Sequence, residues 1–202
     1  EGSTPKRVVG IARAKATLQQ ERSGDAMAAP GMVPPNPDVP TLAEMSLGAI
    51  NVLDNDPDGF FLMIEGGAVD WANHDNQPGR MVEEMIDFDH AVEAVVQWVE
   101  QNSSWDETLV VVTGDHECGH LCGPDDAASL PDVESNGPGK LPNMKYRSRD
   151  HTISLISFYS KGPGTALFEA FADQTDPKRG PYLDNTELGK AVEEVVADGV
   201  GG

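Results

Sequence analysis

The chain has 202 residues, of which 39% are hydrophobic, and its 34 acidic residues outnumber the 14 Lys and Arg to give a formal net charge of -20. This length can bury one sizeable core, and so strong a negative charge disfavours binding to nucleic acid or to anionic membrane surfaces. No apolar run approaches the roughly 20 residues that cross a bilayer, so we expect no membrane span. The start at Glu1 shows no signal peptide and no Met, which favours a processed product or a fragment.

The first forty residues combine a short apolar run with a proline-rich connection. Residues 7–12 (RVVGIA) fit a strand, and the composition of residues 14–24 favours a helix that ends at a glycine. Residues 28–40 hold five prolines, which remove many backbone N–H donors. We therefore predict a surface loop over residues 28–40.

Two amphipathic helices are predicted on either side of a buried strand. Thr41 is a good N-cap, and Glu44 completes a capping box at the start of a helix that runs to the NDPDG turn. Residues 60–64 (FFLMI) are continuously apolar, which is typical of a parallel strand covered on both faces. From Met81 to about Gln101 the helical spacing of apolar residues returns.

The second half of the chain contains further strand and helix signals. Residues 109–112 (LVVV) fit a second buried strand, residues 153–158 a third, and residues 186–197 a closing helix after a GPGTA turn. Strands separated by long helices and crossover-length connections imply a mainly parallel sheet flanked by helices. The predicted fold class is therefore α/β.

Polar segments follow the two buried strands directly. The segment from Glu65 to His74 comes after the first strand, and the segment from Asp115 to His120 comes after the second. Parallel sheets bind ligands beyond the carboxyl ends of their strands, so these segments predict a functional site.

The polar segments carry residues that bind metal ions. Histidine combined with carboxylate favours zinc, whereas Glu65 with further oxygen donors suits magnesium better. One such residue alone more often caps a turn or faces solvent, so the prediction depends on their clustering. His90, inside the predicted long helix, is expected to be a surface or packing residue. The candidate ligands are Glu65, Asp70, His74, Asp115, His116 and His151.

Cys118 and Cys122 are the only cysteines of the chain. Four residues apart, they fit a small disulfide loop, a metal-binding pair or two free thiols equally well. The sequence assigns them no role.

Three motifs resemble the alkaline phosphatase family. They are GFFLMIEGGAVDWANH at residues 59–74, VVVTGDHECG at 110–119 and DHTISLISFYSKGPG at 150–164. They occur in the family's order and spacing, and the resemblance runs from about Leu42 to Gly164. It implies that residues 1–202 form the C-terminal part of an alkaline phosphatase domain, with its metal-binding core at about 42–164.

The resemblance also implies roles for individual residues. It makes Asp70, His74 and His151 ligands of one zinc, Asp115 and His116 ligands of a second zinc, and Glu65 a magnesium ligand. In the family's mechanism the two zincs activate a serine alkoxide, and a zinc-bound hydroxide later hydrolyses the phosphoserine. His120 is a candidate to orient a ligand through a hydrogen bond. The implied substrate is a phosphomonoester, and the implied parent protein is a homodimer in the periplasm or outside the cell.

Parts of the family's site are missing from these residues. No Asp-Ser-Ala-like turn occurs, so we expect no catalytic nucleophile in this chain, and the family's phosphate-clamping Arg, bridging Asp and magnesium-site Thr have no match. Arg147 and Arg149 are therefore expected to be surface residues. The first zinc site has all three protein ligands, the second has two of three and the magnesium site has one, so metal affinity should fall in that order.

Three other functions are compatible with parts of the sequence. Residues 116–120 (HECGH) match the H-E-x-x-H motif of zinc proteases, but that motif works only on a helix, and Gly119 and the nearby Gly-Pro oppose one. A related phosphodiesterase or phosphomutase would share the metal ligands. A non-catalytic metal-binding fragment would also fit the missing nucleophile.

Overall fold

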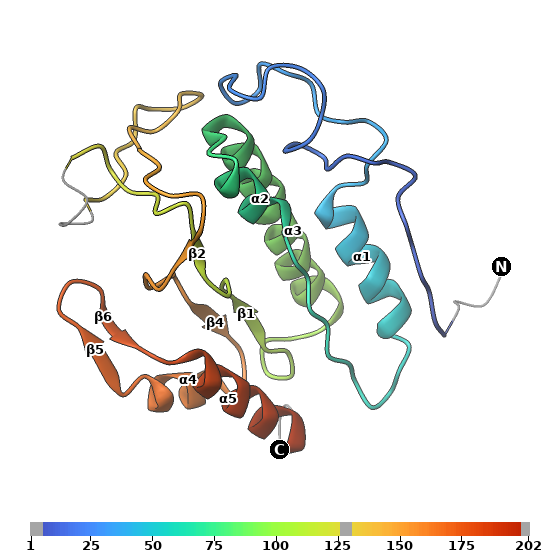
Figure 1. The fold of residues 1–202 in the computed structure, drawn as a ribbon. Coiled ribbons are helices and arrows are strands. Elements are labelled where there is room, and N and C mark those ends of the chain that lie inside the picture. The colour runs from blue at the N-terminus through green and yellow to red at the C-terminus, as the bar shows by residue number, and fades with distance from the viewer. Residues whose placement is uncertain (1–5, 126–130, 199–202) are drawn as a thin grey trace. The chain divides into compact units, whose positions relative to one another are not determined.

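The computed structural model describes residues 6–125 and 131–198, whose helices and strands are drawn in Figure 1. The chain divides into two compact units. Among the described residues, the first unit comprises 6–95, 118–125 and 131–151, and the second comprises 96–117 and 152–198. That these units belong to a single domain over residues 1–202 stays a prediction. No helix in the described ranges is long and apolar enough to cross a membrane.

The first unit is mainly helical. It contains α1 (Leu42–Leu53), α2 (Ala68–His74) and the first part of α3 (Pro78–Asn102). The predicted capping box starts α1, since Thr41 Oγ1 accepts the Glu44 N–H at 3.2 Å and Glu44 Oε2 accepts the Thr41 N–H at 2.8 Å. The next residue, Leu42, donates its N–H to Asp87 Oδ2 of α3 at 3.1 Å, which ties the start of α1 to that helix.

The second unit combines short antiparallel strands with two helices. Its strands are β1 (Val110–Val112), β4 (Tyr159–Lys161), β5 (Gln174–Asp176) and β6 (Gly180–Tyr182). β1 pairs with β4, and β5 pairs with β6 in a hairpin. The helices α4 (Thr165–Phe171) and α5 (Asn185–Asp198) pack against each other. Two further strands, β2 (Glu117–Cys118) and β3 (His151–Thr152), pair with each other.

The strand predictions need correction. β1 pairs antiparallel with β4 and not with a parallel neighbour, and no strand is assigned to residues 60–64 or 153–158. Phe61 and Met63 are 68% and 76% exposed instead of buried. A run of apolar residues indicates a preference for burial. A strand also needs a neighbouring strand to form hydrogen bonds with, and the run does not show which segment that is.

The helix predictions are mostly confirmed. α1, α3 and α5 lie where the apolar spacing placed them, within a few residues at each end. The strand expected at residues 7–12 does not form, and these residues have no regular structure. The helix expected at 14–24 does not form either, and bends and turns occupy much of that segment. α2, α4 and the β5–β6 hairpin were not predicted, because each is too short for a clear periodicity.

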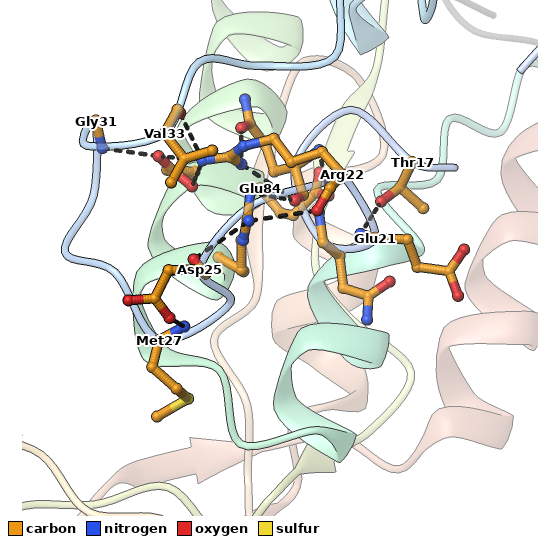
Figure 2. A network of polar contacts seen from close by, with 12 residues as sticks. Thr17, Glu21, Arg22, Asp25, Met27, Gly31, Val33 and Glu84 are labelled. Atoms are coloured by element: carbon orange, nitrogen blue, oxygen red, sulfur yellow. Dashed lines mark hydrogen bonds and ion pairs between the residues drawn. The ribbon is translucent and has the colours of Figure 1, made fainter. Parts of the chain in front are cut away.

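Polar contacts, rather than regular structure, hold the first loop onto α3 (Figure 2). Arg22 Nη2 donates to both carboxylate oxygens of Glu83, at 2.9 and 2.7 Å, and to the Val33 carbonyl at 2.8 Å. Glu83 Oε1 also accepts the Gly31 N–H at 2.7 Å. A charge-assisted contact between largely buried groups is strong even though a single guanidinium nitrogen makes it, so this ion pair fastens the proline-rich loop to the helix.

Arg80 and Glu84 lie one turn apart on α3 and are both buried beneath the same loop. Arg80 Nη1 donates to the Gln19 carbonyl at 2.9 Å. Glu84 Oε1 accepts the N–H groups of Gln19 and Gln20, at 3.1 and 2.7 Å. Burial raises the pKa of the Glu84 carboxyl, and the two backbone hydrogen bonds oppose part of that rise.

Replacing Glu84 with glutamine should change how stability depends on pH. Because the folded pKa of Glu84 lies above its unfolded value, the unfolded chain releases this proton first as pH rises, and the folded state loses stability through that window. The amide of Glu84→Gln does not titrate. The free energy of unfolding of the variant, relative to the parent chain, should therefore increase as pH rises from about 4.3 upward.

Urea unfolding followed at several pH values measures this difference. Glu100→Gln, at an exposed position of the same helix, controls for the loss of one negative charge. A difference between the Glu84→Gln and parent chains that stays flat or falls with rising pH would refute the prediction.

Candidate metal centre

The short helix α2 carries two of the predicted ligands. Asp70 lies in its first turn and His74 in its last, four residues apart. This spacing places both side chains on one face of the helix. Asp70 Oδ2 lies 3.3 Å from His74 Nε2, so one turn of helix brings together a carboxylate oxygen and an imidazole nitrogen.

His151 reaches the same place from a distant part of the sequence. It begins β3, and its Nε2 atom lies 2.9 Å from His74 Nε2 and 3.2 Å from Asp70 Oδ1. Two neutral imidazole lone pairs at this separation repel each other unless a proton or a cation lies between them. Either one imidazole N–H donates to the other ring nitrogen, or a bound cation takes both lone pairs, so a metal ion fits between them.

The hydrogen bond on the other side of His74 determines which of its nitrogens is free to bind. His74 Nδ1 contacts the carbonyl oxygen of Arg149, which can only accept, so Nδ1 carries the proton. In neutral His74 this leaves a lone pair on Nε2, which faces Asp70 and His151. Histidines that bind metal usually donate their second ring N–H in this way.

The ligand atoms match the dimensions of a zinc site. A tetrahedral zinc with nitrogen and oxygen ligands at its usual bond lengths holds neighbouring ligand atoms about 3.3 Å apart. The three separations among Asp70, His74 and His151 are 2.9, 3.2 and 3.3 Å. Asp70 Oδ1 is also buried and accepts no hydrogen bond from any described residue. Both the donor types and their spacing fit a zinc ion.

Cys118 is a fourth residue at this cluster that the sequence did not identify. The Sγ of Cys118 and the ligand atoms of Asp70, His74 and His151 all lie within 4.8 Å of one another. Cys118 is buried, and its Sγ lies 3.7 Å from the backbone carbonyl of Asp70. The sequence did contain one sign of this role, since Cys118 lies in the same polar turn as His116. The nearby Cys122 made a disulfide or a metal-binding pair of cysteines equally plausible, so no role was assigned.

Gly119 holds the strand that carries Cys118 close to α2. Its φ is +88°, and a Cβ at this position would lie 2.7 Å from the Tyr146 ring and 3.3 Å from the Asn73 carbonyl of α2. The Gly119 N–H donates to the Asp150 carbonyl at 3.1 Å, one residue before His151. Only glycine combines this backbone conformation with this close approach.

Asp115 and His116 follow β1 in the second unit. Asp115 Oδ2 lies 3.1 Å from His116 Nε2, and the Asp115 side chain is 88% exposed. Among residues 6–125 and 131–198, no third His, Cys, Asp or Glu completes a metal-binding group with these two. The structure thus brings together the two predicted ligands and no further one.

Glu65 precedes α2 and does not join the cluster around Asp70 in the described part of the chain. Its side chain is exposed and folds back over Gly67, where Oε1 would lie 3.2 Å from an added Cβ. The prediction that Glu65 binds magnesium stays untested by this geometry.

The backbone of residues 116–120 excludes the helical zinc-protease motif. Glu117 and Cys118 form β2, and Gly119 and His120 have φ values of +88° and +47°. His120 Nε2 is buried without a hydrogen-bond partner among the described residues, and His120 is not part of the Asp70 cluster. Its proposed role in orienting a ligand stays a prediction.

The two arginines near His151 differ from each other. Arg149 is exposed, as expected, although its carbonyl holds His74. Arg147 is half-buried and donates to Cys122 Sγ at 3.1 Å and to the Gly123 carbonyl at 3.2 Å, so it is a structural residue of the loop and not a surface one. His90 is exposed on α3, as predicted.

Comparisons with known proteins place these features in one family. The alkaline phosphatase family profile matches residues 6–131. Alkaline phosphatase H of Pseudomonas aeruginosa is 33% identical over 146 residues, which cover 69% of this chain and 30% of that protein. The alkaline phosphatase of Escherichia coli is 33% identical over 148 residues, or 70% of this chain and 31% of its own length. The chain thus spans about a third of the relatives it matches.

Solved structures agree on the fold. The alkaline phosphatase of the Antarctic bacterium TAB5 superposes with a TM-score of 0.56 at 25% identity, over 78% of this chain and 40% of that one. A cold-active alkaline phosphatase from a psychrophilic Shewanella species gives a TM-score of 0.59 at 22% identity, over 80% of this chain and 51% of that one. These matches confirm the predicted alkaline-phosphatase-like fold as a partial domain. Since the family profile matches more than half of its length, this chain belongs to the alkaline phosphatase family.

Proposed function

We propose that this chain supplies the principal metal-binding part of an alkaline phosphatase that hydrolyses phosphomonoesters. The observation that carries the proposal is the convergence of Asp70, His74 and His151, whose ligand atoms lie 2.9 to 3.3 Å apart. These three residues would hold the first zinc. Their carboxylate and imidazole donors suit that ion and leave room for a further ligand.

The second zinc and the magnesium ion would bind less completely to this chain. Asp115 and His116 would provide two ligands for the second zinc, and Glu65 would provide one for magnesium. A variant of the TAB5 alkaline phosphatase has been solved with magnesium bound in its M3 site, which supports a magnesium ion in the parent protein. Sites with fewer protein ligands bind metal more weakly, so affinity should fall from the first site to the third.

The metal ions would polarise the phosphoryl group and activate the attacking oxygen. Asp70 and His151 would bind the ion together with His74. The Arg149 carbonyl accepts the His74 Nδ1–H and so would keep the Nε2 lone pair of His74 available for the ion. The nucleophile itself would come from outside these 202 residues. We propose a homodimer, in the periplasm or outside the cell, as the state of the parent protein.

Two alternatives share the metal ligands. A phosphodiesterase or phosphomutase of the same superfamily would differ in residues that contact the substrate, and a non-catalytic domain would bind metal without turnover. The relatives from Pseudomonas aeruginosa, Escherichia coli and Bacillus subtilis are named alkaline phosphatases, which favours phosphomonoester hydrolysis. Activity regained on mixing the chain with the N-terminal half of the enzyme would separate a catalytic part from a purely binding domain.

Zinc titration of the full chain should reveal about one tight site, since the first site alone has three converging protein ligands. Isothermal titration calorimetry measures the stoichiometry. The same chain should turn over nitrophenyl phosphate negligibly, because we expect the nucleophile to come from outside these residues.

Two outcomes would contradict this prediction in different ways. Robust turnover of nitrophenyl phosphate by the pure chain would show that the nucleophile lies within it. Absence of zinc binding would overturn the assignment of the metal ligands.

A further inference from the structure

The thiol of Cys118 lies where a fourth metal ligand would be expected. Its Sγ is within 4.8 Å of the ligand atoms of Asp70, His74 and His151. Cys118 is 6% exposed, so bulk water has little access to the sulfur. The three other ligand atoms approach from α2 and β3, and Cys118 approaches from β2, the strand paired with β3.

Cys122 shows that burial alone does not explain this placement. It is also buried, 5% exposed, and outside any disulfide, but its Sγ accepts a hydrogen bond from Arg147 Nε at 3.1 Å. Cys122 is not part of the metal-binding group in the described residues. The chain therefore contains two similar thiols, and only one of them faces the candidate metal ligands.

We infer that Cys118 is the fourth protein ligand of the first metal site. The inference rests on the proposed function only in that Asp70, His74 and His151 must hold a metal ion. On binding, the Cys118 thiol releases its proton to the solvent, and the thiolate sulfur donates an electron pair to the ion. The result is a site of one carboxylate, two imidazoles and one thiolate.

The distances allow this ligation after a small adjustment. Around a tetrahedral zinc, a sulfur ligand and its nitrogen or oxygen neighbours lie about 3.6 Å apart. Since the sulfur lies within 4.8 Å of the other ligand atoms, it would need to approach them by about 1.2 Å at most. The contact from Cys118 Sγ to the Asp70 carbonyl, at 3.7 Å, is a weak hydrogen bond that costs little to give up.

A thiolate ligand changes what the site can bind. Sulfur is a soft ligand that selects zinc and cobalt over magnesium and calcium. A fourth protein ligand also occupies the position that catalytic zinc sites keep open for water or substrate. Cys118 would thus bind the ion when substrate is absent, and it would have to leave or be joined by a fifth ligand when substrate binds.

Cobalt(II) titration of the full chain tests the assignment by spectroscopy, independently of activity. Thiolate bound to cobalt gives a charge-transfer absorption band in the near ultraviolet, which imidazole and carboxylate do not give. The parent chain and Cys122→Ser should both show this band at one equivalent of cobalt. Cys118→Ser should lose the band and bind cobalt at least about 100-fold more weakly, because loss of a direct ligand exceeds the loss of a residue that only orients one, while saturating cobalt still gives the visible bands of a site with His and Asp ligands.

The possible results separate the two proposals. Bound cobalt without a thiolate band in the parent chain would overturn the role of Cys118 and leave the Asp70, His74 and His151 site standing. A band that survives in Cys118→Ser, or disappears only in Cys122→Ser, would also overturn it. Absence of cobalt binding to the parent chain would overturn the metal site itself.

Discussion

Replacing His74 with alanine is expected to lower the zinc affinity of the chain by more than about 100-fold, because loss of a direct ligand exceeds the loss of a residue that only orients one. His74 Nε2 lies 2.9 Å from His151 Nε2 and 3.3 Å from Asp70 Oδ2, so it contacts both other ligands. Without it, only Asp70 and His151, with Cys118 as the proposed further ligand, remain to hold the ion. Isothermal titration calorimetry with zinc measures the change.

His90→Ala is the matched control for this prediction. His90 is the same residue type, lies on α3 and is exposed away from the cluster. Its replacement should leave zinc affinity unchanged within about two-fold, because a surface position away from special features rarely affects a site. Equal losses in His74→Ala and His90→Ala would indicate non-specific binding of zinc by histidines and would contradict the site.

Replacing Gly119 with alanine is expected to lower the free energy of unfolding by about 2 to 5 kcal/mol, from the cost of a left-handed backbone and of overpacking together. The added Cβ would lie 2.7 Å from the Tyr146 ring, which is itself fixed by its hydroxyl to Asn73 Oδ1 at 2.8 Å. Relief of this clash must move β2 away from α2. We therefore expect zinc affinity to fall as well, by about 10-fold or more, since a small misplacement of ligands weakens a metal site.

The Gly137→Ala variant separates the cost of the left-handed backbone from the cost of overpacking. Gly137 has a φ of +93°, similar to that of Gly119, but an added Cβ there would meet nothing within 4 Å. This variant should show the backbone penalty alone, about 1 to 2 kcal/mol, with zinc affinity unchanged. Thermal or urea unfolding gives the stability and calorimetry gives the affinity. If both variants lose the same stability and neither loses affinity, the close packing of Gly119 against α2 has no bearing on the site.

The candidate site was largely visible in the sequence. Asp70 and His74 four residues apart, together with His151 in a third motif, were expected to share one metal, and the structure brings their side chains together. Whether they bind zinc stays a prediction, as does the role of Glu65. Cys118 could not be identified in this way, because its proximity depends on the pairing of β2 with β3 and on the close approach permitted by Gly119.

The sequence by itself determined those features whose signals are local. The capping box at Thr41 and the regular apolar spacing from Met81 onward predict α1 and α3, because helix hydrogen bonds join residues only four apart. Only the tertiary structure decided which strands pair, how Arg22 and Arg80 hold the first loop on α3, and which cysteine faces the metal ligands. Each of these contacts joins groups that are distant in sequence, and a local sequence pattern does not indicate which distant group becomes the partner.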